Sequence, residues 1–181
     1  MKIIDNLKKK IKREKHAWDK FYPKDKLKIE VPNMSLYEYI YEQNKDRQDN
    51  IALNYFNKNI TYRELFNEIN ICAKAMRSQG IRSGDVVAVC MANTPEAVIA
   101  FYAISKIGAI ANMIHPLSAE EEIKQSLIAT KSVMLIAINL TYKNVKNIIE
   151  DTNVYKTVIV SARDSMPTLL GIGYYLLEDR K

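Results

Sequence analysis

Apolar positions along the chain change their period at regular intervals from residue 33 onward, and each change predicts a new element. Residues 86–92 form a continuous apolar run rich in valine, which is typical of a strand covered on both faces. Shorter apolar runs at 109–113, 133–138 and 157–160 predict three more strands of the same kind. The chain therefore contains four predicted buried strands.

Helical patterns alternate with these strands. Thr61 followed by Glu64 has capping-box spacing ahead of an apolar helical stripe, and Gly80 is positioned to end that helix. A second helix should start at Thr94 and Pro95 and end at Gly108. A third should begin at Ser118 with Glu121 and run to about residue 129, and a weaker pattern predicts a fourth at 141–150. Because parallel strands need crossover connections, the alternation predicts an α/β fold: a mainly parallel, doubly wound sheet with helices on both faces.

Two features precede this series. The runs 51–56 and 60–62 flank Asn57, Lys58 and Asn59, which predicts a β-hairpin, and a short helix capped by Asn33 or Ser35 should run to Tyr41. Earlier still, apolar residues at helical spacing alternate with lysines, which predicts a basic amphipathic arm; the stripe is Ile4, Leu7, Ile11, Trp18 and Phe21 or Tyr22. We expect the arm and a linker over 1–32, and the α/β domain over 33–181.

Charge is distributed unevenly along the 181 residues, of which 48% are hydrophobic and 27% charged, as in an ordinary globular protein. Residues 1–30 hold 11 Lys and Arg against 5 Asp and Glu, while the rest holds 16 of each kind, so the net charge of +6 belongs to the arm. A body without net charge argues against a nucleic-acid partner. The arm either packs on its own domain or, through residues 1–22, contacts an anionic membrane surface. The longest apolar run, 97–104, is too short to cross a bilayer, so we expect a cytoplasmic protein, with peripheral membrane contact as the alternative.

Motifs that carry chemistry are scarce. None of the five glycines lies in a GxxxxGK[ST] loop or a complete GxGxxG turn, and the sequence has no GxSxG, HExxH or metal-ligand spacing. Cys72 and Cys90 lie inside apolar stretches, which indicates reduced, packed thiols. The positions just after the strands are where an open parallel sheet binds ligands; they are Asn93, Thr94, His115, Pro116, Asn139, Thr141 and 161–164. Spacing alone assigns no catalytic, cofactor-binding or metal-binding residue.

Several local strings, in order, resemble the adenylate-forming (AMP-binding) superfamily, which includes acyl-CoA synthetases, luciferases and the adenylation domains of peptide synthetases. Residues 60–65 (ITYREL) resemble the family's "TY-x-EL" start, and residues 80–89 resemble its "G-x-x-x-GD-x-V" segment. Further similar strings are 93–96, 103–113 and 118–127, and residues 17–23 resemble the "W…YP" arm of fatty-acyl-CoA ligases. The resemblance thus covers residues 17 to about 160 and favours the long-chain fatty-acid–CoA ligase branch.

The resemblance implies an activity for a longer parent protein. In this family a carboxylic acid attacks ATP to give an acyl adenylate, and CoA then displaces AMP, so the parent would use ATP, Mg²⁺ and CoA. The family's phosphate loop ends in Lys-Gly and would be expected to begin about where this chain stops, at Lys181. We therefore expect the amino-terminal portion of such a ligase, inactive alone, with the missing remainder of the ligase as its partner. None of the family's catalytic or cofactor-binding residues is carried over.

Three residues are candidates for the wall of an acyl or CoA channel. Asn112, His115 and Pro116 lie at or after the carboxyl end of a predicted strand. The alternative function is a freestanding, non-catalytic α/β module that binds or interacts with another molecule. A severed domain should also expose an apolar patch or an unpaired strand edge, which favours self-association.

Overall fold

A computed structural model describes residues 19–23 and 31–176. The chain divides into two compact units, Met1–Asn33 and Met34–Lys181, which are described separately. In the first unit, a short 3₁₀ helix, η1 (Asp19–Phe21), places the ammonium of Lys20 4.9 Å from the centre of the Phe21 ring. Residues 1–18 of the predicted amphipathic arm lie outside the described residues.

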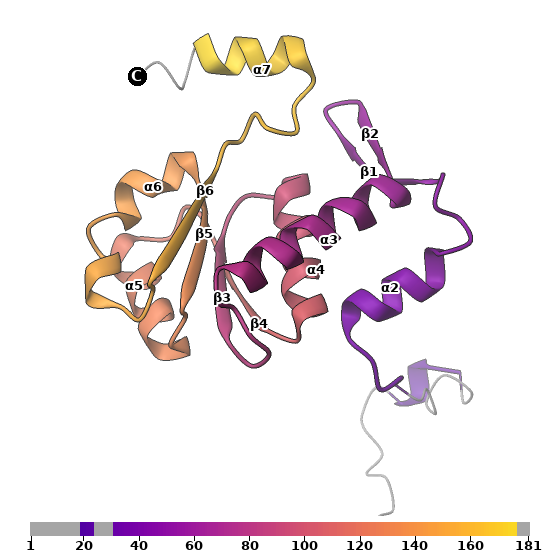
Figure 1. Ribbon diagram of the computed structural model, residues 1–181, viewed down its shortest axis with the longest axis horizontal. Helices are drawn as coiled ribbons and strands as arrows, with labels where there is room; N and C mark the ends of the chain where they lie inside the picture. Colours follow the sequence, from indigo (N-terminus) through magenta and orange to yellow (C-terminus); the bar gives the residue numbers. More distant parts are fainter. Residues whose placement is uncertain (1–18, 24–30, 177–181) are drawn as a thin grey trace, which may run out of the picture. The chain divides into compact units, whose positions relative to one another are not determined.

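A four-stranded parallel sheet forms the centre of the second unit (Figure 1). Its strands are β3 (Val86–Cys90), β4 (Ile110–Ile114), β5 (Met134–Ile138) and β6 (Lys156–Val160), in the spatial order β4-β3-β5-β6. The strand β3 pairs with β4 on one side and with β5 on the other, and the order reverses after β4. This is the doubly wound topology that the sequence predicted.

Helices cover both faces of this sheet. One face packs against α3 (Tyr62–Ser78) and α4 (Pro95–Ile107), and the other against α5 (Glu120–Thr130) and α6 (Asn139–Val145). The central strands supply both layers by alternation: Val87 and Val89 face α3 and α4, whereas Ala88 and Cys90 face α5 and α6. The core is therefore two clusters of buried side chains separated by the sheet.

A helix and a hairpin precede the sheet. The helix α2 (Leu36–Asn44) packs on α3 and α4, with the ring of Tyr41 5.1 Å from that of Phe66. The hairpin β1 (Ile51–Tyr55) and β2 (Lys58–Thr61) leads directly into α3, whose N-cap Thr61 accepts a hydrogen bond from the backbone N–H of Glu64. Both the hairpin and this capping box were predicted.

Several elements differ from the predictions. The hairpin turns at Phe56 and Asn57, both with positive φ, so Lys58 already belongs to β2. The helix α5 has Ala119 rather than Ser118 as its N-cap. The predicted helix at 141–150 is instead α6 followed by a 3₁₀ turn, η3 (Ile149–Asp151), and a further helix, α7 (Thr168–Tyr174), was not predicted. None of the helices described is long and apolar enough to span a membrane.

Candidate binding site at the carboxyl ends of the strands

Loops that follow the parallel strands meet at one edge of the sheet, as the sequence predicted. After β3 the chain crosses to the face of α4, whereas after β5 it crosses to the face of α6, so a crevice opens between these connections. Two hydrogen bonds hold the edge together. The hydroxyl of Thr141 donates to the carbonyl oxygen of Pro116 at 3.3 Å, and the backbone N–H of Ala162 donates to Oδ1 of Asn139 at 3.4 Å.

A hollow of about 370 Å³ lies at this edge, and we call it the His115 hollow. Its lining comes from the segments after β3 and β4, the end of β5 and the start of α6: Met91, Ala92, Asn93, His115, Pro116, Leu117, Ile138, Leu140 and Thr141. Two of the three predicted channel residues, His115 and Pro116, are among them. Their proposed role as channel residues remains a prediction.

His115 is held in one orientation within this lining. Its Nδ1 accepts a hydrogen bond of 3.2 Å from the backbone N–H of Leu117, which assigns the proton of the neutral ring to Nε2. No other described residue bonds to Nε2. This nitrogen can therefore donate to an oxygen atom of a bound molecule.

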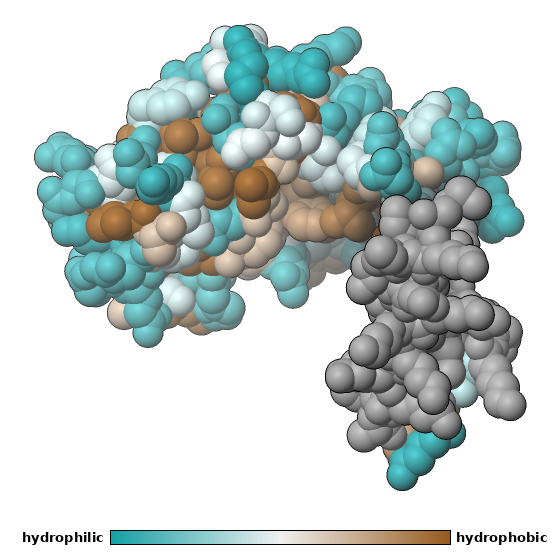
Figure 2. Space-filling model, turned by 90° about the horizontal axis from the view of Figure 1, so that it is seen from below, coloured by the Kyte–Doolittle hydropathy of each residue, from teal (hydrophilic) through white to brown (hydrophobic). Residues whose placement is uncertain are grey.

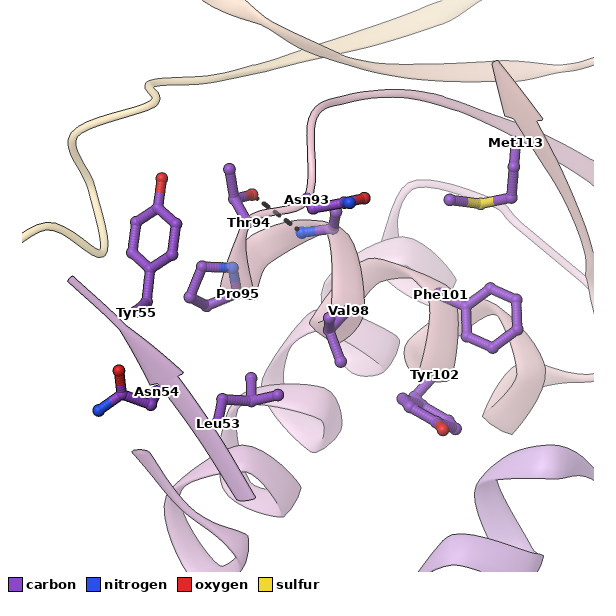
Figure 3. Close-up of a pocket in the computed structure, with 11 residues that line it drawn as sticks. Leu53, Asn54, Tyr55, Asn93, Thr94, Pro95, Val98, Phe101, Tyr102 and Met113 are labelled. Carbon is purple, nitrogen blue, oxygen red and sulfur yellow. Dashed lines mark hydrogen bonds between the residues drawn. The ribbon is translucent and has the colours of Figure 1, made fainter. Parts of the chain in front are cut away.

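A second hollow of about 420 Å³ lies between the hairpin and α4, and we call it the aromatic hollow (Figure 3). The strand β1 contributes its last three residues, α4 contributes one face, and β4 contributes a single side chain. The lining residues are Leu53, Asn54, Tyr55, Asn93, Thr94, Pro95, Ala97, Val98, Phe101, Tyr102 and Met113. Figure 3 shows Tyr55 at one end of this hollow, near Thr94 and Pro95, and Phe101 with Met113 at the other.

Local sequence explains why α4 presents this face. Thr94 has extended backbone angles and accepts a hydrogen bond of 3.4 Å from the backbone N–H of Ala97, while Pro95 supplies the first helical residue without a surplus N–H donor. Phe101 and Tyr102 follow one another, so their side chains leave the helix about 100° apart. Their rings meet edge to face at 5.2 Å. The start of the helix is thereby fixed at the mouth of the hollow.

Tyr55 brings a phenol with a raised pKa to the lining. Burial is the main reason that its pKa is raised above the usual value, and the nearby Glu96 and Tyr174 raise the pKa further. The phenol therefore stays neutral at physiological pH and can both donate and accept a hydrogen bond.

Asn112, the third predicted channel residue, lines neither hollow. Its amide donates to the hydroxyls of Ser126 and Thr130, each at 3.1 Å, and lies 3.4 Å from the hydroxyl of the fully buried Ser132. These contacts fasten β4 to α5. Because successive strand residues face opposite sides of the sheet, the next residue, Met113, is the one that reaches the aromatic hollow.

Asn93 lines both hollows, so the two are neighbours that share this side chain. The first hollow is mainly aliphatic and aromatic, and the second also has His115 in its lining. A small molecule with an apolar body and an oxygen-bearing head suits such a pair of neighbouring hollows. The sequence predicted Asn93 and His115 as site residues, but not Leu53, Val98 or the aromatic residues of α4. One signal was available: Phe101 and Tyr102 are adjacent in a helix and cannot both face the same core, so one of them had to face another space.

The described residues do not fit a nucleoside triphosphate with its Mg²⁺. Among them there is no group of three or more His, Cys, Asp or Glu side chains that could hold a metal ion. The three glycines with positive φ, namely Gly80, Gly84 and Gly108, precede β3 and β4 and thus lie at the opposite edge of the sheet. No backbone cradle for phosphate groups faces the two hollows among these residues.

Comparison with known proteins places this site in context. Residues 40–172 match the family model described as AMP-binding enzyme. A long-chain-fatty-acid–CoA ligase of Bacillus subtilis (strain 168) is 25% identical over 165 residues, which are 91% of this chain and 30% of the relative. An acetyl-coenzyme A synthetase of Shewanella baltica (strain OS195) is 38% identical over 79 residues, 44% of this chain and 12% of the relative.

Solved structures give the same result for the fold. The crystal structure of the anthranilate CoA ligase AuaEII in complex with anthranoyl-AMP has a TM-score of 0.68 and 26% identity, covering 72% of this chain and 26% of that one. A long-chain-fatty-acid–CoA ligase from Archaeoglobus fulgidus has a TM-score of 0.67 and 22% identity, covering 73% and 28%. The chain thus spans less than a third of the length of these relatives.

Proposed function

This chain belongs to the AMP-binding enzyme family, and on that premise we propose that it forms the part of an acyl- or aryl-CoA ligase that receives the carboxylic acid. The observation that carries the proposal is that Asn93 lines both the aromatic hollow and the neighbouring His115 hollow. The apolar body of the acid would occupy the aromatic hollow, and its carboxylate would lie at Asn93 and His115. A volume of about 420 Å³ suits an aromatic acid or an aliphatic acid of moderate length.

Each end of this site has a distinct task. Burial of the apolar body against Val98, Phe101 and Met113 supplies affinity, since removal of apolar surface from water is favourable. The amide of Asn93 and the Nε2 of His115 supply orientation, because both can donate hydrogen bonds to a carboxylate oxygen. The side chains of this chain therefore bind and orient the acid but transfer no group themselves.

ATP, Mg²⁺ and CoA belong to the proposed parent ligase, in which ATP activates the acid and CoA receives the acyl group. The described residues contain neither a metal-ligand group nor a phosphate cradle at the binding edge, so the groups that hold ATP and Mg²⁺ would come from the remainder of the ligase. The proposed partner of this chain is the remainder of the ligase. The proposal also includes fatty-acid substrates and a cytoplasmic location. It further includes contact of residues 1–22 with a membrane, although most of these residues lie outside the described ones.

Binding of simple acids tests the proposal. Saturation-transfer difference NMR with benzoate and octanoate should detect weak binding to the chain, and Met113→Trp, which fills the aromatic hollow, should weaken it by about fivefold or more. Met113 is 53% exposed, so the larger side chain can be accommodated without disturbing the core.

The matched control is Ile128→Trp, which adds the same side chain at a partly exposed position of α5 that lines neither hollow. This variant should bind both acids as the unmodified chain does. Equal binding by the Met113→Trp variant, or a signal as strong from benzamide and octanamide as from the acids, would contradict the proposal.

A further inference from the structure

The turns that precede β3 and β4 form the amino edge of the sheet, opposite the aromatic hollow and the His115 hollow. In Figure 1 this is the lower edge, where α3 and α4 end, and Figure 2 looks onto it from below. Figure 2 shows a band of hydrophobic residues on this side, bordered by hydrophilic ones. Polar and charged side chains therefore gather around the ends of the two helices.

A hollow of about 560 Å³ lies at this edge, and we call it the amino-edge hollow. Its lining comes from the end of α3, the turn that leads into β3 and the end of α4: Arg77, Ser78, Ile81, Arg82, Ser83 and Ile107. Two of these residues are arginines and none is acidic, so the lining is positively charged at neutral pH.

The guanidinium of Arg82 is held in place by the backbone beside it. Its Nη1 donates to the carbonyl oxygen of Arg77 at 3.0 Å and to that of Ile81 at 3.1 Å. The other edge of the group, formed by Nε and Nη2, has no hydrogen-bond partner within the part of the chain that the structure describes. Such an edge is the fork that binds two oxygen atoms of a phosphate or carboxylate group side by side. Because the fork is already oriented, less entropy is lost when it binds an anion.

The carbonyl groups that end α3 are already hydrogen-bonded. The carbonyl oxygen of Met76 accepts from the backbone N–H of Ile81 at 3.1 Å, and that of Arg77 accepts from the backbone N–H of Gly80 at 3.1 Å as well as from Arg82. These bonds offset the negative end of the helix dipole, which would otherwise repel an anion.

Arg77 brings a second cation to the hollow. Its side chain is exposed and forms no ion pair or hydrogen bond with another described residue. The carboxylate of this turn, Asp85, does not line the hollow, and its Oδ2 accepts from the backbone N–H of Arg82 at 2.7 Å. Two guanidinium groups beside one hollow repel each other, so their charges favour an anion between them.

We propose that the amino-edge hollow binds the phosphate group of a small phosphate monoester, with Arg82 as the fork that holds two of its oxygen atoms and Arg77 as the second cation. A dianionic phosphate group matches the two arginines in charge, whereas a monocarboxylate would neutralise only one. The volume of about 560 Å³ leaves room for the organic part of the monoester beside its phosphate group. The site lies at the opposite edge from the acid-binding hollows, so it takes no part in activation of the acid and does not depend on the proposed function.

NMR titration of the arginine side chains tests the binding. At constant ionic strength and a pH of about 8, where phosphate is mainly dianionic, glycerol 3-phosphate and inorganic phosphate should each shift the Nε–Hε signals of Arg77 and Arg82 saturably. We expect a dissociation constant of about 1 mM or below. Acetate should bind about tenfold more weakly or worse, and glycerol should leave both signals in place.

Substitution of each arginine tests its role. Arg77→Gln and Arg82→Gln should each weaken the binding of glycerol 3-phosphate by about fivefold or more, followed through the signal of the remaining arginine. Arg82→Lys keeps the charge but loses the fork, so it should also bind more weakly. The matched control is Arg47→Gln, the same change of charge at an exposed arginine that does not line the hollow, and it should bind normally.

Circular dichroism establishes that each variant is folded. Arg82 also braces the end of α3, whereas the side chain of Arg77 makes no such bond, so Arg77→Gln tests the proposal even if Arg82→Gln does not fold. Absence of a saturable shift, binding by Arg77→Gln as tight as by the unmodified chain, an equal loss in Arg47→Gln, or acetate as tight as phosphate would overturn the proposal.

Discussion

Gly108 shows how a single residue sets the geometry beside β4. It ends α4 in the left-handed region with φ of 82°, and a Cβ atom at this position would lie 2.8 Å from the hydroxyl oxygen of Ser83. That hydroxyl donates to the carbonyl oxygen of Gly108 at 3.1 Å, so the two turns at this edge are joined. Only glycine meets both demands, of conformation and of space.

Replacement of this glycine should therefore cost more than its backbone conformation alone. We expect Gly108→Ala to lower the free energy of unfolding by about 2–3 kcal/mol, measured by urea titration followed by circular dichroism. Gly84→Ala is the matched control, because Gly84 also has a positive φ, of 87°, but open space where its Cβ would stand. It should lose only about 1–2 kcal/mol, and equal losses would show that the Ser83 contact is unimportant.

The residues of β4 show which features of the site could be predicted from the sequence and which could not. The strand, its parallel neighbours and the edge at which His115 lies followed from apolar runs alone. Which of two neighbours, Asn112 or Met113, faces the hollow did not follow, because the strand is half-exposed and its pattern lacks clear alternation. The Asn112 amide instead donates hydrogen bonds to the hydroxyls of Ser126 and Thr130, which only the fold brings close to it.

Among the helices, α5 lacks a side-chain cap. Its N-cap, Ala119, has the extended backbone that capping residues adopt, but no side-chain acceptor; only the carboxylate of Glu122 reaches back, accepting from the Ala119 N–H at 3.3 Å. The preceding Ser118, the cap predicted from the sequence, lies one residue outside. The helix is thus one acceptor short at its first turn.

Ala119→Ser should supply the missing acceptor. We expect a gain of about 0.5–1 kcal/mol in the free energy of unfolding, measured by thermal and urea denaturation. Ser118→Ala is the control and should change stability by less than about 0.5 kcal/mol, since Ser118 does not cap the helix. A larger loss from Ser118→Ala, with no gain from Ala119→Ser, would mean that the helix begins one residue earlier.

Other elements separate into those with strong local signals and those without. The helix α3 carries a capping box, an apolar stripe and a terminal glycine, and the sequence located it closely. The helix α7 contains Gly171 and Gly173 and has no side-chain cap, so nothing local distinguishes it from a loop. Its place depends on tertiary contacts, such as packing of Tyr174 against the larger core cluster.

For the whole molecule, membership in the AMP-binding family and the share of its relatives that it spans lead to one expectation about catalysis. The chain should not catalyse acid-dependent exchange of labelled pyrophosphate into ATP, because the electrostatic stabilisation of phosphate groups that such a step needs is not supplied by the described residues. The assay contains ATP, Mg²⁺ and benzoate or octanoate. A parallel assay with a full-length ligase of the family gives the positive control, and exchange by this chain above the rate without acid would refute the expectation.

The division of the core by the sheet has a consequence for which amino-acid substitutions this protein can accept during evolution. The aromatic hollow draws on the hairpin and α4, and the His115 hollow on the segments after β3 and β4 and on the start of α6, whereas Ile123 and Leu127 of α5 belong to the cluster behind the sheet. Exchanges among aliphatic residues in that rear layer alter stability while leaving the acid-binding walls in place. Variation in substrate preference and variation in robustness can therefore accumulate separately, with the sheet as the partition between them.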